Sequence, residues 1–246
     1  MVKEIWKVKV LSIGNSFSED AQRYLHRLAK KEGEWFKTAN LYIGGCSLRQ
    51  HYVNCLDDRM AYVYEFNGEY TGLLTSIKQA LTSDEWDVVT LQQASLESGN
   101  FETYSPYIET LVEYVKKYCP KAKIYLHQTW AYEDGSERLI KKAGYATAED
   151  MFSAVRAAYE KAAKLIGADS IIPSGQAIMN ATKLGIEKIH RDTFHMSYGA
   201  GRYLLALVWF KALTGKDITN NAFDEFDHPV TGEERAIVIK AVNEAF

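Results

Sequence analysis

Short apolar segments rich in β-branched residues alternate along this chain with longer segments of helical periodicity. Strands that alternate with helices form βαβ units, in which the strands of the sheet run parallel. The segments with the length and composition of strands cover residues 8–13, 35–43, 87–91, 123–126 and 169–172. We therefore predict an α/β fold with a central, mainly parallel five-stranded sheet.

Helical patterns occupy most of the sequence between these strands. We expect helices over residues 17–31, 73–81, 107–118, 147–166, from about 176, over 199–213 and over 233–246. Residues 46–70 are instead polar and rich in tyrosine, and alternation over 60–66 suggests a small hairpin within this insert. Since no glycine- or proline-rich linker divides the chain, we predict a single domain over residues 1–246.

The composition excludes several classes of protein. Hydrophobic residues make up 47% and charged residues 25%, as in globular proteins. The formal net charge of −3 leaves no basic excess for nucleic-acid binding and favours a small uncharged ligand. Three cysteines without a CxxC motif indicate neither a disulfide framework nor a zinc site. No long apolar run or signal-like segment is present, so we expect no membrane partner and a cytoplasmic location, or a periplasmic or secreted one if a signal peptide was removed.

Polar clusters follow the first three parallel strands, at the edge of the sheet where such folds bind ligands. Ser16 lies in the turn between the first strand and a helix, where the helix N-terminus favours developing negative charge. This position suits a nucleophile. Helix capping by Ser16 or Ser18 explains the same residues, whereas a phosphate-binding loop is disfavoured because the turn has only one glycine and no Walker lysine.

Asp192 precedes His195 by three residues, just before a predicted helix. At this spacing the carboxylate can bind one ring nitrogen and leave the other free as a base. A polar surface loop is the alternative interpretation, and His190 competes for the histidine role.

Gly45 and Gln93 follow the second and third strands. The backbone N–H of Gly45, the Gln93 amide and the backbone N–H of Ser16 could together form an oxyanion hole. The alternatives are a turn glycine and a structural glutamine, and Gln92 competes with Gln93 for this role.

Taken together, these blocks resemble those of the SGNH (GDSL-like) hydrolases. The sequences GNSFS at 14–18, GGCSL at 44–48, LQQAS at 91–95 and DxxH at 192–195 are most similar to a bacterial branch, the DUF4886 group. The resemblance implies a flavodoxin-like three-layer α/β/α sandwich, a Ser16–His195–Asp192 triad, and an oxyanion hole formed by Ser16, Gly45 and Gln93. The chain departs from the family at Asn15, where aspartate is usual, and at residues 92–95, where Gly-x-Asn-Asp is usual.

The resemblance further implies a serine esterase that hydrolyses a small acyl, in particular acetyl, ester through an acyl-enzyme without a metal or organic cofactor. Trp130, Gln92 and Tyr52 lie in segments that border the predicted site, so we expect them to bind substrate, which suggests a carbohydrate ester. The alternative is that the aromatic side chains of Trp130 and Tyr52 pack onto the sheet and do not contact substrate. A catalytically silent carbohydrate-binding protein and a flavodoxin-like nucleotide binder are the competing functions, and the sequence does not predict an oligomeric state.

Overall fold

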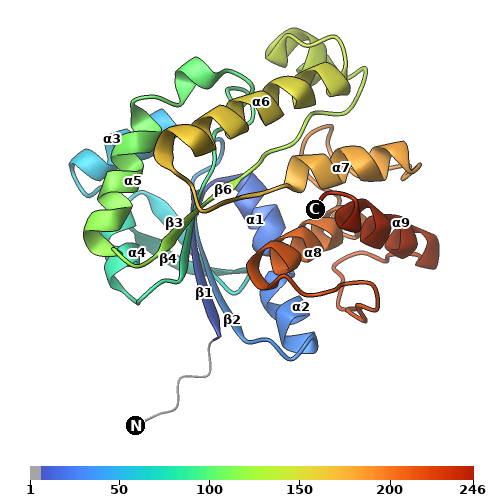
Figure 1. The fold of residues 1–246 in the computed structure, drawn as a ribbon, viewed down its shortest axis with the longest axis horizontal. Helices are drawn as coiled ribbons and strands as arrows, with labels where there is room; N and C mark the ends of the chain where they lie inside the picture. The colour runs from blue at the N-terminus through green and yellow to red at the C-terminus, as the bar shows by residue number, and fades with distance from the viewer. Residues whose placement is uncertain (1–6) are drawn as a thin grey trace.

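The computed structural model describes residues 7–246, which form a central sheet between two layers of helices (Figure 1). The strands are β1 (Val8–Gly14), β2 (Phe36–Tyr42), β3 (Tyr62–Phe66), β4 (Glu69–Thr75), β5 (Val88–Leu91), β6 (Lys123–His127) and β7 (Ser170–Ile172). Their order across the sheet is β4-β3-β2-β1-β5-β6-β7. Strands β2, β1, β5, β6 and β7 are parallel, while β3 and β4 are antiparallel to their neighbours.

The two helical layers cover opposite faces of the sheet (Figure 1). One layer contains α1 (Ser16–Gln22), α2 (Leu25–Lys31), α7 (Ser174–Lys183), α8 (Ala200–Thr214) and α9 (Gly232–Asn243). The other contains α3 (Leu48–Leu56), α4 (Ile77–Thr82), α5 (Tyr107–Tyr118) and α6 (Ala148–Ile166). Two short turns complete the described elements, the 3₁₀ turn η1 (Phe101–Thr103) and the π-helical turn η2 (Arg138–Ala143). The predicted α/β class with a mostly parallel central sheet is thus confirmed.

The sheet has seven strands rather than the predicted five, because the insert at 46–70 contributes to it. Helix α3 and strand β3 lie within the insert, and the β3–β4 hairpin extends the sheet beyond β2. The helix predicted over 73–81 is wrong in its first three residues, which belong to β4. Helix α4 begins only at Ile77, where Ser76 caps it by accepting a hydrogen bond from Gln79 N. The helix predicted over 17–31 is divided into α1 and α2.

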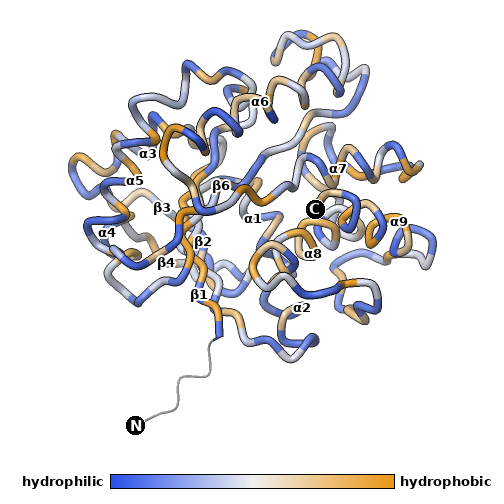
Figure 2. Tube along the Cα trace, viewed as in Figure 1, coloured by the Kyte–Doolittle hydropathy of each residue, from blue (hydrophilic) through white to orange (hydrophobic). Residues whose placement is uncertain are grey.

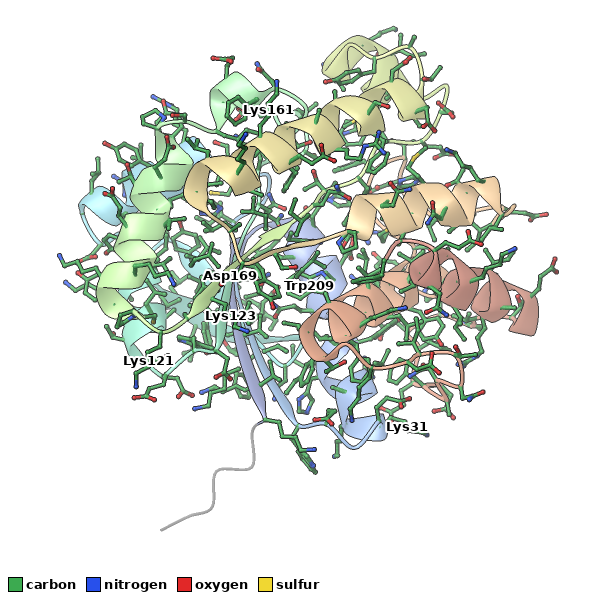
Figure 3. The ribbon with its side chains drawn as sticks, in the orientation of Figure 1. Lys31, Lys121, Lys123, Lys161, Asp169 and Trp209 are labelled. Atoms are coloured by element: carbon green, nitrogen blue, oxygen red, sulfur yellow. The ribbon has the colours of Figure 1, made fainter. Side chains whose placement is uncertain are left out.

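Helix α8 lies at the centre of its layer and is mostly apolar, with Arg202 as the one charged residue between Ala200 and Phe210. All of its residues from Ala200 to Phe210 are buried, and Figure 2 shows hydrophobic colours along this helix. Trp209, labelled in Figure 3, is fully buried and packs edge-on against His127 at the end of β6, with ring centroids 4.8 Å apart. A helix that is hydrophobic all round requires burial on all sides, and α1, α2, α7 and α9 surround α8 accordingly. Among residues 7–246, no helix is long and apolar enough to cross a membrane.

Candidate active site

Three residues predicted to act together meet at the carboxyl edge of the parallel strands. The Oγ of Ser16 lies 2.9 Å from Nε2 of His195, and Nδ1 of the same ring lies 2.7 Å from Oδ2 of Asp192. The other carboxylate oxygen of Asp192 accepts a hydrogen bond from the backbone N–H of His195 at 2.8 Å. Asp192 therefore fixes both the position and the tautomer of the imidazole, and leaves Nε2 facing the serine hydroxyl.

The charge of Asp192 suits this arrangement. Burial raises the pKa of its carboxyl, but the hydrogen bonds from His195 outweigh burial and leave that pKa below the usual value. The carboxylate is therefore ionised at neutral pH. An anion at this position stabilises the imidazolium that forms when His195 takes a proton.

The turn from β1 to α1 holds Ser16 at the first position of the helix. Asn15 is the N-cap: its Oδ1 accepts from Phe17 N at 3.0 Å, and its Nδ2 donates to the Cys46 carbonyl at 3.1 Å. The turn is too tight for a side chain at Gly14, where a Cβ would lie 2.1 Å from Ser18 Oγ. Asn15 and Ser18 thus form a capping box, in which Ser18 Oγ accepts from the backbone N–H of Asn15 at 3.1 Å, and the Ser16 hydroxyl is free to face His195.

A buried hydrogen-bonded chain supports Asn15 from behind. Gln92 Nε2 donates to Asn15 Oδ1 at 2.6 Å, and Gln92 Oε1 lies 2.8 Å from Nδ1 of His127. The Nε2 of His127 lies 3.1 Å from Ser174 Oγ. Burial lowers the pKa of His127 to about 3, so this ring is neutral and donates through Nδ1 to the glutamine oxygen. Gln92, which we expected to bind substrate, thus lies buried beneath the nucleophile turn.

The loop that carries His195 is tied to the nucleophile helix by a second buried residue, Asp20 of α1. Both of its carboxylate oxygens lie 2.8 Å from Nη1 of Arg191, and Oδ1 also accepts from Nε of Arg202 at 2.8 Å. Oδ2 accepts from the backbone N–H of Met196, next to His195, at 3.1 Å. No local pattern in the sequence marks Asp20 for this role. Its two arginine partners lie far along the chain.

A cavity of about 330 Å³ opens in front of Ser16 and His195. It is lined by Asn15, Ser16, Phe17, Glu19, Tyr42, Gly44, Gly45, Ser95, Arg138, Arg191, Phe194 and His195. Gly45, which was predicted to be an oxyanion donor, lines this cavity together with Ser16. Its φ of +64° is a conformation that favours glycine. The backbone N–H of Ser16 belongs to the first helical turn, where such groups have no partner within the helix.

The structure does not bring the Gln93 amide to this cavity. Its Nε2 donates to both the carbonyl and Oγ1 of Thr103 at 3.0 Å, and its Oε1 accepts from the backbone N–H groups of Leu48 and Ala94 at 2.9 Å. The side chain is fully buried, and both its amide nitrogen and its amide oxygen are occupied by hydrogen bonds within the protein. The alternative of a structural glutamine therefore describes Gln93, and Ser95 is the residue of this loop that lines the cavity.

Two aromatic residues expected to bind substrate are also placed outside the cavity lining. Trp130 is fully buried and stacks on Phe17 with ring centroids 3.9 Å apart, so it lies behind the wall that Phe17 forms. Tyr52 of α3 packs against Tyr107, with ring centroids 5.5 Å apart. His190, the competing histidine, is buried with Nε2 3.2 Å from the Ala131 carbonyl. No group of three metal-binding side chains is found among the described residues.

Comparison with solved structures places the fold among esterases and hydrolases. A DUF4886 family protein from Bacteroides uniformis is 35% identical, with a TM-score of 0.90 over 97% of this chain and 94% of that one. A protein from Slackia heliotrinireducens that is assigned to the SGNH hydrolases is 25% identical, with a TM-score of 0.60 over 83% and 97%. Axe2, an acetylxylan esterase from Geobacillus stearothermophilus, is 15% identical, with a TM-score of 0.56 over 85% and 95%.

No curated protein matches the chain. The model of the family described as domain of unknown function DUF4886 matches residues 9–245, nearly the entire length. The resemblance inferred from the sequence blocks is thereby confirmed, and the chain belongs to the DUF4886 family within the SGNH hydrolase fold.

Proposed function

We propose that this protein is a serine esterase that hydrolyses a small acyl ester, with Ser16 as nucleophile, His195 as base and Asp192 as the residue that orients the base. The observation that carries the proposal is the continuous contact from Ser16 Oγ to His195 Nε2 at 2.9 Å and from Nδ1 to Asp192 at 2.7 Å. This is the geometry that activates a serine hydroxyl, which is a weak nucleophile when isolated.

In this mechanism His195 removes the Ser16 proton as Oγ attacks the ester carbonyl carbon. The tetrahedral intermediate collapses when the protonated imidazole returns that proton to the leaving alcohol. The acyl group then remains on Ser16. Water, deprotonated in turn by His195, attacks the acyl-enzyme and releases the carboxylic acid and the free serine.

The negative charge of the tetrahedral intermediate needs hydrogen-bond donors on the side of the cavity away from the imidazole. The backbone N–H groups of Ser16 and Gly45 are the donors that we assign to this role, because both residues line the cavity at the N-terminus of α1. One such donor typically contributes about 3 kcal/mol to the lowering of the barrier. The Gln93 amide is not included because Thr103 occupies its donors.

The size and character of the cavity favour a short acyl group on a polar alcohol. About 330 Å³ is at the small end of the range of ligand sites, and arginine, glutamate, tyrosine and serine side chains line much of it. A long acyl chain would need an extended apolar wall. An acetyl group on a carbohydrate satisfies both features, and Axe2, which shares the fold, is an acetylxylan esterase.

Labelling with a fluorophosphonate tests the proposal, because this reagent modifies only an activated serine. We expect one adduct on Ser16 by peptide mass spectrometry, and hydrolysis of p-nitrophenyl acetate that is abolished by Ser16→Ala. Ser83→Ala is the matched control, because Ser83 ends α4 and its hydroxyl bonds the Ala80 carbonyl away from the cavity. Folded protein that is neither labelled nor active at any pH would refute the esterase and favour the silent carbohydrate-binding alternative.

A further inference from the structure

Arg138 carries a positive charge at the wall of the active-site cavity without an acidic partner. Within residues 7–246 no carboxylate lies within ion-pair distance of its guanidinium, and its buried Nε has no hydrogen-bond partner. The guanidinium carbon lies 3.6 Å from the ring centroid of Phe194 and 5.2 Å from that of Tyr132. A buried guanidinium donor without an acceptor is costly, so the placement of Arg138 calls for an explanation.

Two other arginines near the cavity have carboxylate partners, which Arg138 lacks. Arg191, which lines the same cavity, and Arg202 both bind the buried carboxylate of Asp20, and Arg202 also binds Asp227. Among the described residues, Glu19 is the only acidic side chain that lines the cavity, and it is not paired with Arg138. The cavity therefore contains one guanidinium whose charge is not matched by a protein anion.

The position of Arg138 indicates which part of an ester it would meet. Phe194, on which Arg138 stacks, is next to His195 in the chain, and their ring centroids are 3.8 Å apart. In acyl transfer the imidazole returns its proton to the leaving oxygen, so the alcohol lies on the histidine side of the cavity. The acyl oxygen faces the backbone donors instead. Arg138 therefore borders the space of the leaving alcohol.

We propose that Arg138 binds a carboxylate on the alcohol part of the ester, so that the substrate class is an acylated sugar acid or hydroxy acid. This inference rests on the proposed esterase function and adds the charge of the substrate to it. A planar guanidinium placed over an aromatic ring is well suited to bind a carboxylate through two parallel hydrogen bonds. The single positive charge of Arg138 matches the single negative charge of a carboxylate, whereas a phosphate carries up to two negative charges. In this proposal the local charge of Arg138, rather than the net charge of the chain, selects the ligand, so the proposed ester is anionic where the composition favours an uncharged one.

A matched pair of acetyl esters provides the test, namely 3-acetoxybenzoate and 3-acetoxybenzamide, which differ in charge but little in shape. We measure kcat/KM for both and correct each for its uncatalysed hydrolysis. The expected result is a preference of about tenfold or more for the carboxylate, because a hydrogen bond to a charged group contributes about 1.5–3 kcal/mol. Arg138→Gln should bring this preference to about one, and Arg138→Lys should retain part of it.

Lys141→Gln is the control variant because it removes the same charge from the same π-helical turn. Lys141 is exposed and pairs with Glu137, so its loss should leave both the preference and the activity unchanged. A second readout is independent of turnover: in the Ser16→Ala background, calorimetry should detect 3-hydroxybenzoate binding that weakens about tenfold with Arg138→Gln. Equal hydrolysis of the two esters by the wild type, or a preference that survives Arg138→Gln, overturns this inference and leaves the esterase intact. Hydrolysis of neither ester by protein whose Ser16 is labelled by the fluorophosphonate would overturn this inference alone, whereas the absence of both labelling and hydrolysis would refute the esterase as well.

Discussion

Gln92 donates a 2.6 Å hydrogen bond to Oδ1 of Asn15, the residue immediately before the nucleophile. The same glutamine accepts from His127, which is neutral because burial lowers its pKa to about 3. The position of the Ser16 turn thus depends on residues at the ends of β5 and β6 that do not line the cavity. Residues at the ends of β5 and β6 therefore help to position the hydroxyl group of Ser16, which follows β1.

This relationship predicts the effect of Gln92→Met, which keeps the volume but removes both hydrogen bonds. The His127 donor loses its acceptor inside the protein, so the free energy of unfolding should fall by about 1–3 kcal/mol in urea titrations. Because the nucleophile turn loses its support, kcat for p-nitrophenyl acetate should fall by about tenfold or more. Gln50→Met is the control, since Gln50 bonds Asn54 on α3 away from the cavity. Unchanged kcat with reduced stability would show that Asn15 holds the turn without Gln92.

The features that could be predicted from the sequence depend on the spacing of nearby residues or on the periodic pattern of apolar residues. The five parallel strands follow from short β-branched runs, and Asp192 reaches His195 because it precedes the histidine by three positions. Strand β4 was missed because it is exposed on both faces: Tyr70, Leu73 and Leu74 are all exposed, so its pattern shows no alternation. An apolar run of that kind also fits the start of a helix.

The errors at the site have a different physical origin. Gln92 and Gln93 are adjacent and chemically identical, and only the tertiary partners Asn15 and Thr103 distinguish them. Both face the interior, so neither is free to contact a substrate. Asp20 likewise has no local signature, because its partners Arg191 and Arg202 lie more than 170 residues further along the chain. Such contacts exist only after the fold has formed.

Asp192→Asn tests the orienting role of the carboxylate. An amide in this position cannot stabilise an imidazolium and can favour the wrong tautomer of His195, so kcat should fall by about 10⁴-fold. Steady-state hydrolysis of p-nitrophenyl acetate measures the effect, and circular dichroism verifies the fold. Asp217→Asn is a suitable control because the Asp217 carboxylate accepts hydrogen bonds within its own turn, from the backbone and hydroxyl of Thr219. A loss smaller than tenfold would remove Asp192 from the mechanism.

Asp20→Asn should weaken the contact between helix α1 and the loop that carries His195. The substitution leaves the part-buried guanidinium groups of Arg191 and Arg202 without their shared anion, which typically costs about 3–5 kcal/mol. We therefore expect a large fall in the urea midpoint together with a fall in kcat, because the loop that carries His195 loses its tie to α1. Asp224→Asn removes an exposed partner of Lys31 and should change stability by less than about 1 kcal/mol. Equal effects of the two substitutions would contradict the role of Asp20.

Glu65 on β3 predicts how stability depends on pH. Burial raises the pKa of its carboxyl to about 7, despite the hydrogen bond that Asn40 Nδ2 donates to it at 2.7 Å. In the unfolded chain the same group titrates near its ordinary value of 4.5. Between pH 4.5 and 7 the folded state therefore holds a proton that the unfolded state has released, so this contribution to stability is complete below pH 4.5 and is lost as the pH rises to 7.

The expected loss over this interval is roughly 3 kcal/mol, since each pKa unit corresponds to about 1.4 kcal/mol. Glu65→Gln is uncharged at every pH and can still accept from Asn40, so it should be more stable than the wild type at pH 8 and similar at pH 4.5. Urea titrations of both proteins at half-unit steps between pH 4.5 and 8 measure the difference directly. Because Asn40 also accepts from Ser18 Oγ in the nucleophile turn, ionisation of Glu65 above pH 7 strengthens the Asn40 contact without breaking that bond. If the two stability curves run parallel across this range, the carboxyl of Glu65 is not perturbed by burial.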